Sequence, residues 1–265
     1  MKYKVGEYDL ADIQNVMLEM MADIDRICSE NGIKYILDGG SMIGAVRHNG
    51  FIPWDDDLDI AMMRDDYIKF TEIANEKLKD KYCFQCVENT KEYPYNFGKV
   101  FSKETLFLEH FTSKLDICHG IYIDIFPMDY VDVSNEKKLD VHRKLVSKFT
   151  QIRYMKLGIV KGAMWKKALS SILPMGFVNK QASEHMMYCL DKDCKYVQKL
   201  CHYGKNKPPV STTLFTDTIR VKFEKYSFCI PREYDCFLKG RYGDYMKLPD
   251  VSEQRPLHHI IEVKL

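Results

Sequence analysis

Residues 37–60 read LDGGSMIGAVRHNGFIPWDDDLDI, and the order of elements within this stretch is the strongest indication of the fold. A short strand expected over 34–37 leads into the turn Gly39-Gly40-Ser41 and a brief helical turn over 42–46. An acidic run then precedes a second strand, expected over 58–62. A lone Gly-Gly-Ser is a weak signal, but strand, Gly-Gly-Ser, short helix and Asp-x-Asp in this order are much more specific. The order predicts a site for phosphate and metal.

Strand alternation separates the residues of the acidic run. Side chains of a strand point alternately to opposite faces, so Asp57 and Asp59 share one face while Leu58 and Ile60 share the other. The two carboxylates then stand about 7 Å apart at Cα and repel each other. Mg²⁺ or Mn²⁺ would relieve this repulsion, since hard cations take oxygen ligands. A solvated acidic loop is the alternative, and the apolar flanking residues argue against it.

Four further aspartates are ranked by position. Asp55 shares the face of the pair but lies at the loop edge, and Asp56 falls on the opposite face, where a structural role is expected. Asp124 is the only charge in the β-prone run 121–126, so it is either paired in the structure or functional, as a third metal ligand or a general base. Asp129 is a weaker candidate because Pro127 is expected to end that strand first.

The order of elements predicts an α+β protein. Residues 1–130 combine an amphipathic helix that ends at 31–32, a second helix over 65–78 and strands over 82–87, 97–101 and 120–126. From residue 134 the pattern changes to helix, as far as about 204, and Pro231 and Gly243 are expected to bound a last helix. We therefore expect a mixed-sheet core over 1–130 and a mainly helical region over 131–265, joined in one compact unit.

Composition excludes several classes of protein. The chain of 265 residues is 46% apolar and 29% charged with a net charge of +1, which gives no reason to expect a nucleic-acid partner. No stretch of eighteen apolar residues is present and no secretory signal opens the chain. Nine irregularly spaced cysteines predict free thiols in a cytoplasmic protein. A zinc site is the lesser alternative for one group of residues: His185, Cys189, Cys194, Cys201 and His202.

Charge is distributed unevenly along the chain. Residues 1–76 carry 16 acidic and 7 basic side chains, whereas residues 137–167 carry 10 basic side chains and one acidic one. Such a basic segment is either a solvated helical face or a contact with an anionic surface. In the second case the segment could lie on an anionic membrane, at the inner face of the plasma membrane.

Three motifs resemble the LicD family, the phosphocholine transferases of bacterial surface glycans, which are related to fukutin and fukutin-related protein. The first is the stretch 37–60, the second is residues 123–129, and the third is residues 242–249 followed by Arg255 and His258-His259. The middle, from about 155 to 210, matches poorly, and the gap between Gly-Ser and Asp-x-Asp is slightly longer than usual for the wider superfamily. The resemblance implies a nucleotidyltransferase-like mixed β-sheet flanked by helices, with a helical C-terminal half.

The resemblance also implies an activity. The enzyme would use Mg²⁺ or Mn²⁺ to move a phospho-alcohol from a CDP-activated donor, typically CDP-choline, to a sugar hydroxyl, with release of CMP. The acceptor would be a cell-surface glycan, such as lipopolysaccharide or teichoic acid, or its lipid-linked precursor. Choline, ethanolamine, ribitol and glycerol all remain open as the alcohol. The alternatives are a nucleotidyltransferase that moves NMP from an NTP to a small hydroxylated acceptor, and a nucleotide-binding module without chemistry.

The expected roles of the site residues follow from the resemblance and from their chemistry. Asp57, Asp59 and Asp124 hold the metal and carry out catalysis, and the other expected contacts are with substrate. Donor phosphates are expected to contact Gly40, Ser41, Arg47 and Lys99. A choline head group would favour aromatic walls, for which the candidates are Trp54, Tyr93, Tyr95 and Tyr122. The late residues expected to fold back over the site are Glu224, Arg255, His258 and His259.

Overall fold

The computed structural model describes residues 3–160, 172–190, 193–201 and 208–265. In chain order the elements are β1 (Lys4–Val5), β2 (Tyr8–Asp9), α1 (Leu10–Glu30), β3 (Ile36–Leu37), α2 (Gly39–His48), β4 (Asp59–Met63), α3 (Arg64–Leu78), β5 (Tyr82–Gln85), β6 (Gly98–Ser102), β7 (Leu106–Glu109) and β8 (Tyr122–Tyr130). They continue with α4 (Glu136–Lys156), α6 (Met175–Met186), β9 (Tyr196–Gln198), β10 (Val210–Ser211), α7 (Thr213–Thr216), β11 (Thr218–Phe223), β12 (Tyr226–Pro231), α8 (Tyr234–Tyr242), η1 (Val251–Glu253) and β13 (Ile260–Lys264).

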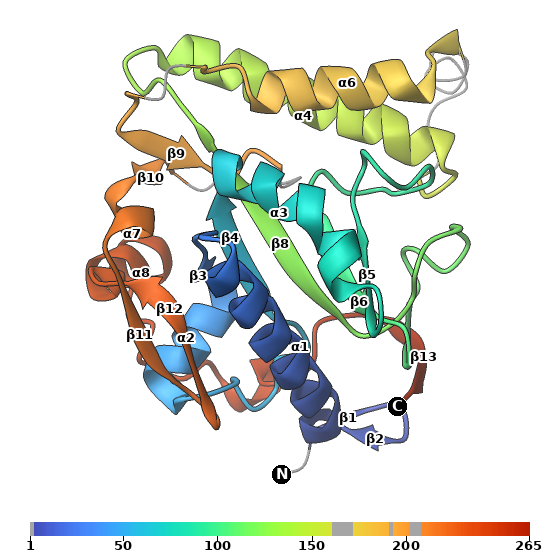
Figure 1. Ribbon diagram of the computed structural model, residues 1–265, viewed down its shortest axis with the longest axis vertical. Helices are drawn as coiled ribbons and strands as arrows, with labels where there is room; N and C mark the ends of the chain where they lie inside the picture. Colours follow the sequence, from blue (N-terminus) through green and yellow to red (C-terminus); the bar gives the residue numbers. More distant parts are fainter. Residues whose placement is uncertain (1–2, 161–171, 191–192, 202–207) are drawn as a thin grey trace.

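A mixed sheet of seven strands with β8 at its centre forms the core (Figure 1). On one edge β8 pairs with β4 in parallel, and on the other it pairs antiparallel first with β6 and then with β9. Strand β3 extends the sheet beyond β4, β5 extends it beyond β6, and β10 extends it beyond β9. The mixed pairing confirms the α+β class that the order of elements predicts.

Strand β8 continues through Pro127, so the expectation that this proline ends the strand is wrong. The N–H of Asp124 points to the β4 edge, where it donates to the carbonyl of Leu58. Because successive residues face alternate edges, the nitrogen of Pro127 points to the other edge. There the pairing with β6 ends at Ile125 and the pairing with β9 begins at Asp129. The missing N–H lies between the two partner strands and removes no ladder bond.

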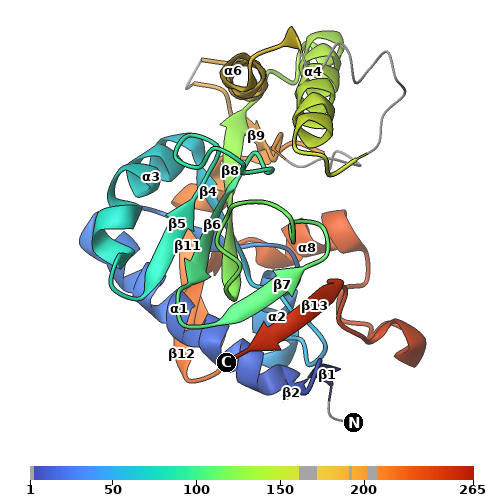
Figure 2. The ribbon, with the colours of Figure 1, turned by 90° about the vertical axis from the view of Figure 1, so that its right-hand side faces the viewer.

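Helices α1 and α3 cover one face of this sheet (Figure 2). The side chains of β4 and β8 that point away from the aspartates are fully buried: Ile60, Met62, Ile123 and Ile125. Burial of each side chain of this size contributes about 1.5–3 kcal/mol, so these residues fix which face is core. The carboxylates consequently stand on the opposite face, which α1 and α3 leave uncovered.

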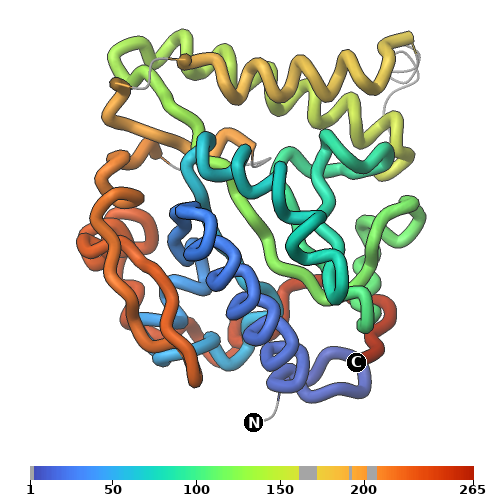
Figure 3. Tube along the Cα trace, viewed as in Figure 1, coloured from blue at the N-terminus to red at the C-terminus, as the bar shows by residue number. Residues whose placement is uncertain are grey.

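The second half of the chain adds helices and more strands than its pattern predicts. Helices α4 and α6 pack side by side as a layer beyond the β8–β9 end of the sheet (Figure 1), and β13 returns to pair with β7 (Figure 2). Pro231 ends the hairpin β11–β12 instead of starting a helix. Helix α8 begins at Tyr234, and Gly243 caps its C-terminal end, as expected. Strands β1 and β2 and the C-terminus lie at the opposite end of the molecule from the α4–α6 layer (Figure 3).

Two predictions from composition concern helices. Among the described residues, every helix is too short or too polar to cross a membrane. The basic segment 137–167 is described only as far as 160; its last seven residues lie outside the described part.

Candidate active site

A row of charged side chains crosses the uncovered face of the sheet. In the strand register Asp59 lies beside Asp124, and Asp124 lies beside Lys99 of β6. Register partners on neighbouring strands project to the same face, so all three side chains stand together. Asp57 lies two residues before Asp59 and joins this face, while Leu58 is fully buried behind it. The alternation inferred for the acidic run is confirmed in the structure.

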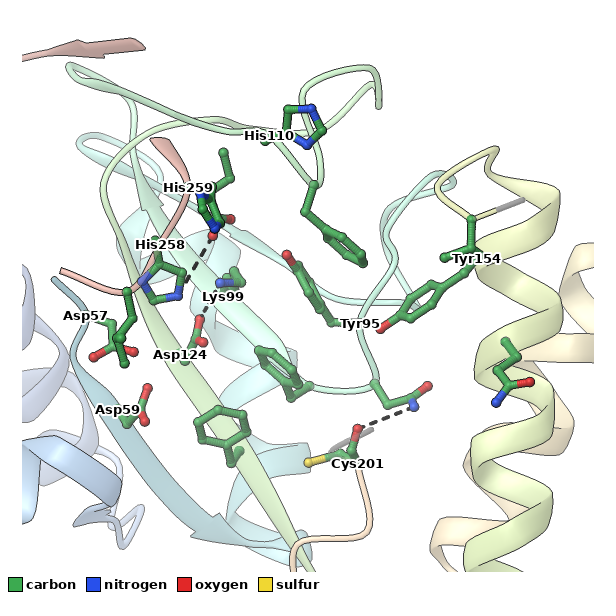
Figure 4. A pocket seen from close by; sticks show the side chains of 18 of the residues that line it. Asp57, Asp59, Tyr95, Lys99, His110, Asp124, Tyr154, Cys201, His258 and His259 are labelled. Carbon is green, nitrogen blue, oxygen red and sulfur yellow. Dashed lines mark hydrogen bonds and ion pairs between the residues drawn. The ribbon is translucent and has the colours of Figure 1, made fainter. Parts of the chain in front are cut away.

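These side chains border a cavity of about 960 Å³ (Figure 4). The carboxylates lie at one end, and Tyr95 and Tyr154 lie at the other. The lining comes from the sheet, the loop after β7, helix α4 and the C-terminal segment: Asp57, Asp59, Tyr95, Asn96, Phe97, Lys99, Glu109, His110, Phe111, Asp124, Phe126, Gln151, Tyr154, Met155, Val160, Cys201, Leu257, His258 and His259. A cavity of this volume suits a nucleotide-sized ligand.

The carboxylates at this end of the cavity repel one another, and their pKa values are raised. Burial, together with the charge of Asp55, raises the pKa of Asp57 to about 8. Burial and the charge of Asp57 also raise the pKa of Asp59 well above its usual value. Burial and the charges of Asp59 and Asp56 raise the pKa of Asp55 to about 7. A bound cation would remove this repulsion.

The donor set fits a metal that takes few protein ligands. The Oδ1 atom of Asp59 is buried without a hydrogen-bond partner, so it is free to coordinate. Within the described ranges no group of three or more His, Cys, Asp or Glu side chains is arranged to hold a metal by itself. Mg²⁺ usually takes one or two carboxylates and completes its shell with waters and substrate phosphates. Asp57 and Asp59 meet that requirement.

Lys99 neutralises Asp124, which makes Asp124 the least free of the three predicted metal ligands. The Nζ of Lys99 lies 2.8 Å from Oδ1 of Asp124 and 3.3 Å from the centroid of the Tyr122 ring. Burial raises the pKa of Asp124, and the charge of Lys99 opposes that shift. Lys99 lines the cavity, as a phosphate contact requires, but its nearest anion is this carboxylate.

The Gly-Gly-Ser element makes room for the carboxylates. Gly39 has a φ of +57°, and a Cβ there would lie 2.9 Å from Oδ2 of Asp59. A Cβ on Gly40 would lie 2.5 Å from Oδ2 of Asp55, so a larger residue would displace that side chain. The Oγ of Ser41 accepts a hydrogen bond of 2.8 Å from the N–H of Asp59. Neither Gly40 nor Ser41 lines the cavity, so the structure shows these residues as supports of the carboxylates, and their contact with phosphate stays a prediction.

Asp56 connects the acidic run to the C-terminal segment. Its carboxylate accepts hydrogen bonds from the N–H groups of Leu257 and His258 and lies 3.0 Å from Nδ1 of His258. Burial alone would lower the pKa of His258, but the bond to Asp56 and the charges of Asp57 and Glu109 raise it to about 9. The imidazole is therefore cationic at neutral pH and lies at the carboxylate end of the cavity (Figure 4). Asp56 has the structural role expected of it.

Besides Gly40 and Ser41, three further predicted substrate contacts are not among the residues that line the cavity. Arg47 donates from Nη1 to the carbonyls of Tyr245 and Lys247, at 2.7 and 3.3 Å. Trp54 packs against the rings of Tyr3 and His48. Arg255 also stands outside the lining, whereas His259 belongs to it. The substrate contacts of Arg47, Trp54 and Arg255 stay predictions.

The aromatic wall differs from the predicted one. Of the four expected aromatics only Tyr95 lines the cavity; Tyr93 and Tyr122 are buried behind it. The other aromatic lining residues come from the segment just before β6, the loop after β7, β8 and α4: Phe97, Phe111, Phe126 and Tyr154. Tyr95 stacks on Phe97 and on Phe111, with ring centroids 5.0 and 6.0 Å apart.

Several positioning residues carry no motif in the sequence. Lys199 and Arg241 form ion pairs with the buried Asp38, the residue before the Gly-Gly-Ser. Burial alone would raise the pKa of Asp38, but the two cations outweigh it and hold that pKa well below its usual range. Arg153 of α4 is fully buried and donates from Nη1 to the carbonyl of Tyr95 at 3.2 Å. It thereby fixes the aromatic wall to the α4–α6 layer.

Among the candidates that the structure describes, the residues considered for zinc do not form a metal-binding group. The Sγ atoms of Cys189 and Cys194 lie 3.2 Å apart, while Nδ1 of His185 contacts Nδ1 of His142. Cys201 is buried near Pro127, and His202 lies outside the described residues. All nine cysteines are free thiols.

Comparisons with known proteins identify a matching family and several relatives. The family described as LicD/FKTN/FKRP, nucleotidyltransferase domain, matches residues 32–149. The lipopolysaccharide cholinephosphotransferase LicD of Haemophilus influenzae is 30% identical over 263 residues, which cover 96% of this chain and 97% of that protein. The human ribitol 5-phosphate transferase FKRP is 49% identical over 35 residues, which cover 13% of this chain and 7% of that protein.

Proposed function

The chain belongs to the LicD family and is a phosphotransferase, and we propose that it moves phosphocholine from CDP-choline to a hydroxyl of a cell-surface glycan or its lipid-linked precursor, releasing CMP. The observation that supports this most directly is the arrangement of Asp57, Asp59 and Asp124 on one face of the sheet, at one end of the cavity. Aromatic side chains line the opposite end. Carboxylates can bind the donor phosphates through a shared cation, and aromatic rings can bind a quaternary ammonium.

Asp57 and Asp59 are the residues we propose as holders of Mg²⁺ or Mn²⁺. The unpartnered Oδ1 of Asp59 and the raised pKa of both carboxyl groups support this, because each is relieved by a cation. A metal held there would neutralise the charge that develops on the departing CMP. The chain then has mainly to position the reactants, as phosphoryl transfer requires.

Asp124 is proposed as the base that accepts the proton of the acceptor hydroxyl. It stands beside Asp59 in the register, so an acceptor at Asp124 would be adjacent to a donor at Asp59. The charge of Lys99, 2.8 Å away, opposes the rise that burial imposes on the pKa of Asp124 and so favours its charged, proton-accepting form. The cationic His258 lies on the same side of the cavity and would balance the negative charge of the phosphates.

The aromatic end is proposed to hold the alcohol of the donor. Ring faces attract a quaternary ammonium by about 0.5–2 kcal/mol per contact, whereas ribitol and glycerol gain no such attraction. Five aromatic side chains line the cavity, and Arg153 fixes the segment that carries Tyr95. This end therefore favours the two cationic alcohols, choline and ethanolamine, over ribitol and glycerol, and the methyl groups of choline would bury more apolar surface against the rings.

The experiment is a donor panel with product analysis. We expect Mg²⁺-dependent release of CMP from CDP-choline, with slower or no release from CDP-ethanolamine, CDP-ribitol and CDP-glycerol. Release of pyrophosphate from an NTP in place of CMP from CDP-choline would identify a nucleotidyltransferase. Metal-dependent thermal stabilisation by CDP-alcohols without any turnover would identify a nucleotide-binding module.

A further inference from the structure

Helix α4 carries a straight row of exposed residues along one side. Lys137, Val141, Lys144 and Lys148 are all exposed, and they follow one another at spacings of four, three and four residues. Such spacings keep side chains on one face of an α-helix. The opposite face of α4 is buried, through Leu139, Val146, Thr150 and Arg153. We call Lys137, Lys144 and Lys148 the lysine row.

The lysine row leads to the cavity. The next residues on the same face of the helix are Gln151 and Met155, and both line the cavity. From Lys137 to Met155 the helix rises by about 27 Å. The neighbouring Tyr154 enters the cavity from the same helix turn (Figure 4). The lysine row and the cavity rim therefore form one continuous surface along α4.

The three lysines differ from two lysines of other helices, which are neutralised within their own helix. Lys180 pairs with Glu184 and Lys239 pairs with Asp235, each four residues away. In the described part of the chain no ion pair involves any member of the lysine row. Asp140, three residues after Lys137 and four before Lys144, is paired with Arg143. The row thus presents three positive charges that form no ion pair within the described residues, and this arrangement attracts an anionic chain.

We propose that the lysine row binds a phosphate-bearing stretch of the acceptor chain and directs its reacting end into the cavity. This rests on the proposed function, because it names the acceptor of that same site as a polyanion. A membrane surface is the other anionic partner, but it would meet a broad face. The row is a single line one residue wide, with Glu136 and Asp140 exposed beside it. A linear anion fits that shape better.

The test uses two matched triple variants of the full chain. One is Lys137→Gln with Lys144→Gln and Lys148→Gln; the control is Lys77→Gln with Lys79→Gln and Lys91→Gln, three exposed lysines elsewhere. The probe is fluorescein-labelled short-chain linear polyphosphate, read by fluorescence anisotropy at low and at physiological salt. A second probe is vesicles of phosphatidylcholine with or without phosphatidylglycerol, read by co-sedimentation. Thermal unfolding verifies that both variants are folded.

We expect polyphosphate binding to weaken about tenfold in the lysine-row variant and to remain unchanged in the control, with a smaller salt dependence in the former. Equal binding by the two variants would overturn the proposal. So would loss of vesicle binding with unchanged polyphosphate binding, which would assign the row to a membrane. Because binding needs no turnover, it is independent of CMP release. Where CDP-choline is consumed, the lysine-row variant should raise the KM for a phosphate-bearing acceptor without changing kcat.

Discussion

The two ends of the β4–β8 strand pair differ in whether their aspartate has a charged hydrogen-bond partner. At one end Asp59 lies beside Asp124 with an oxygen left without a hydrogen bond. At the other end Arg64, the first residue after β4, donates to both oxygens of Asp129 at 2.6 and 2.9 Å. At the first end the carboxylates repel one another and an oxygen remains available to coordinate a ligand. At the second end the bidentate ion pair satisfies the carboxylate completely. The same two strands thus carry a reactive end and a structural end.

The largest expected effect comes from the reactive end. Asp59→Asn should lower transfer about a thousandfold, roughly 4 kcal/mol of transition-state stabilisation, because the cation loses a charged ligand. Stability should not fall, since the substitution removes a repelling charge. CMP release and urea unfolding measure the two quantities. The control is Asp80→Asn, which is exposed and should change neither. Transfer close to that of the parent protein would remove Asp59 from the catalytic machinery.

The structural end should show the reverse pattern. Asp129→Ala leaves the guanidinium of Arg64 buried without its partner and should cost about 3–5 kcal/mol of unfolding free energy. The transfer rate per folded molecule should stay near that of the parent protein at low temperature. The double substitution Arg64→Met with Asp129→Leu should recover much of the loss, because it leaves no unpaired charge. A specific loss of turnover in folded Asp129→Ala protein would contradict the assigned division between the two ends.

Stability should depend on pH through the reactive end. The pKa of Asp57 is raised to about 8 and that of Asp55 to about 7, both above the value in an unfolded chain. The folded protein therefore binds more protons between about pH 4 and pH 8, so metal-free stability falls as pH rises through this range. The pKa of His258, raised to about 9, adds a loss of the same sign between about pH 6.5 and pH 9.

Melting curves from pH 5.5 to 8.5, with EDTA or with Mg²⁺, measure this dependence. Mg²⁺ should raise Tm more at pH 8 than at pH 5.5, since it binds only the deprotonated carboxylates. In the combined variant Asp57→Asn with Asp59→Asn the metal-free slope and the Mg²⁺ effect should both shrink. A Tm that ignores Mg²⁺ at every pH would argue against a cation at these residues.

Sequence reasoning reached the reactive end better than the structural one. Period-two alternation sufficed to separate Asp57 and Asp59 from Asp56, because it is a local property of the backbone. Asp129 lies outside the cavity lining, in keeping with its lower rank as a functional candidate, but the reason for that rank is wrong: the continuation of β8 past Pro127 depends on where β6 and β9 end, which no local pattern records. Its partner Arg64 is 65 positions away in the chain.

The same limit applies to the cavity. His258 and His259 line the cavity because the C-terminal segment is held by hydrogen bonds to Asp56, which lies 201 and 202 positions earlier in the chain. The motifs indicate that this segment folds back but do not specify these bonds. Glu109, Phe111 and Tyr154 sit in segments without a signature, so their convergence follows from tertiary packing alone. Arg47 lies inside the most specific motif, yet it holds main-chain carbonyls of the segment after α8.

The smallest expected effect tests whether the ion pair at the structural end depends on the charge of Arg64 alone or also on the planar shape of its guanidinium. Arg64→Lys keeps the positive charge but replaces a planar fork with a single ammonium, so one of the two hydrogen bonds to Asp129 is lost. We expect a loss of about 1 kcal/mol in urea unfolding, far below that of Asp129→Ala, with transfer unchanged. A loss of unfolding free energy as large as that of Asp129→Ala would mean that the ammonium fails to reach Asp129. The stability of the pair would then depend on the length and bidentate geometry of the arginine side chain, with charge contributing little.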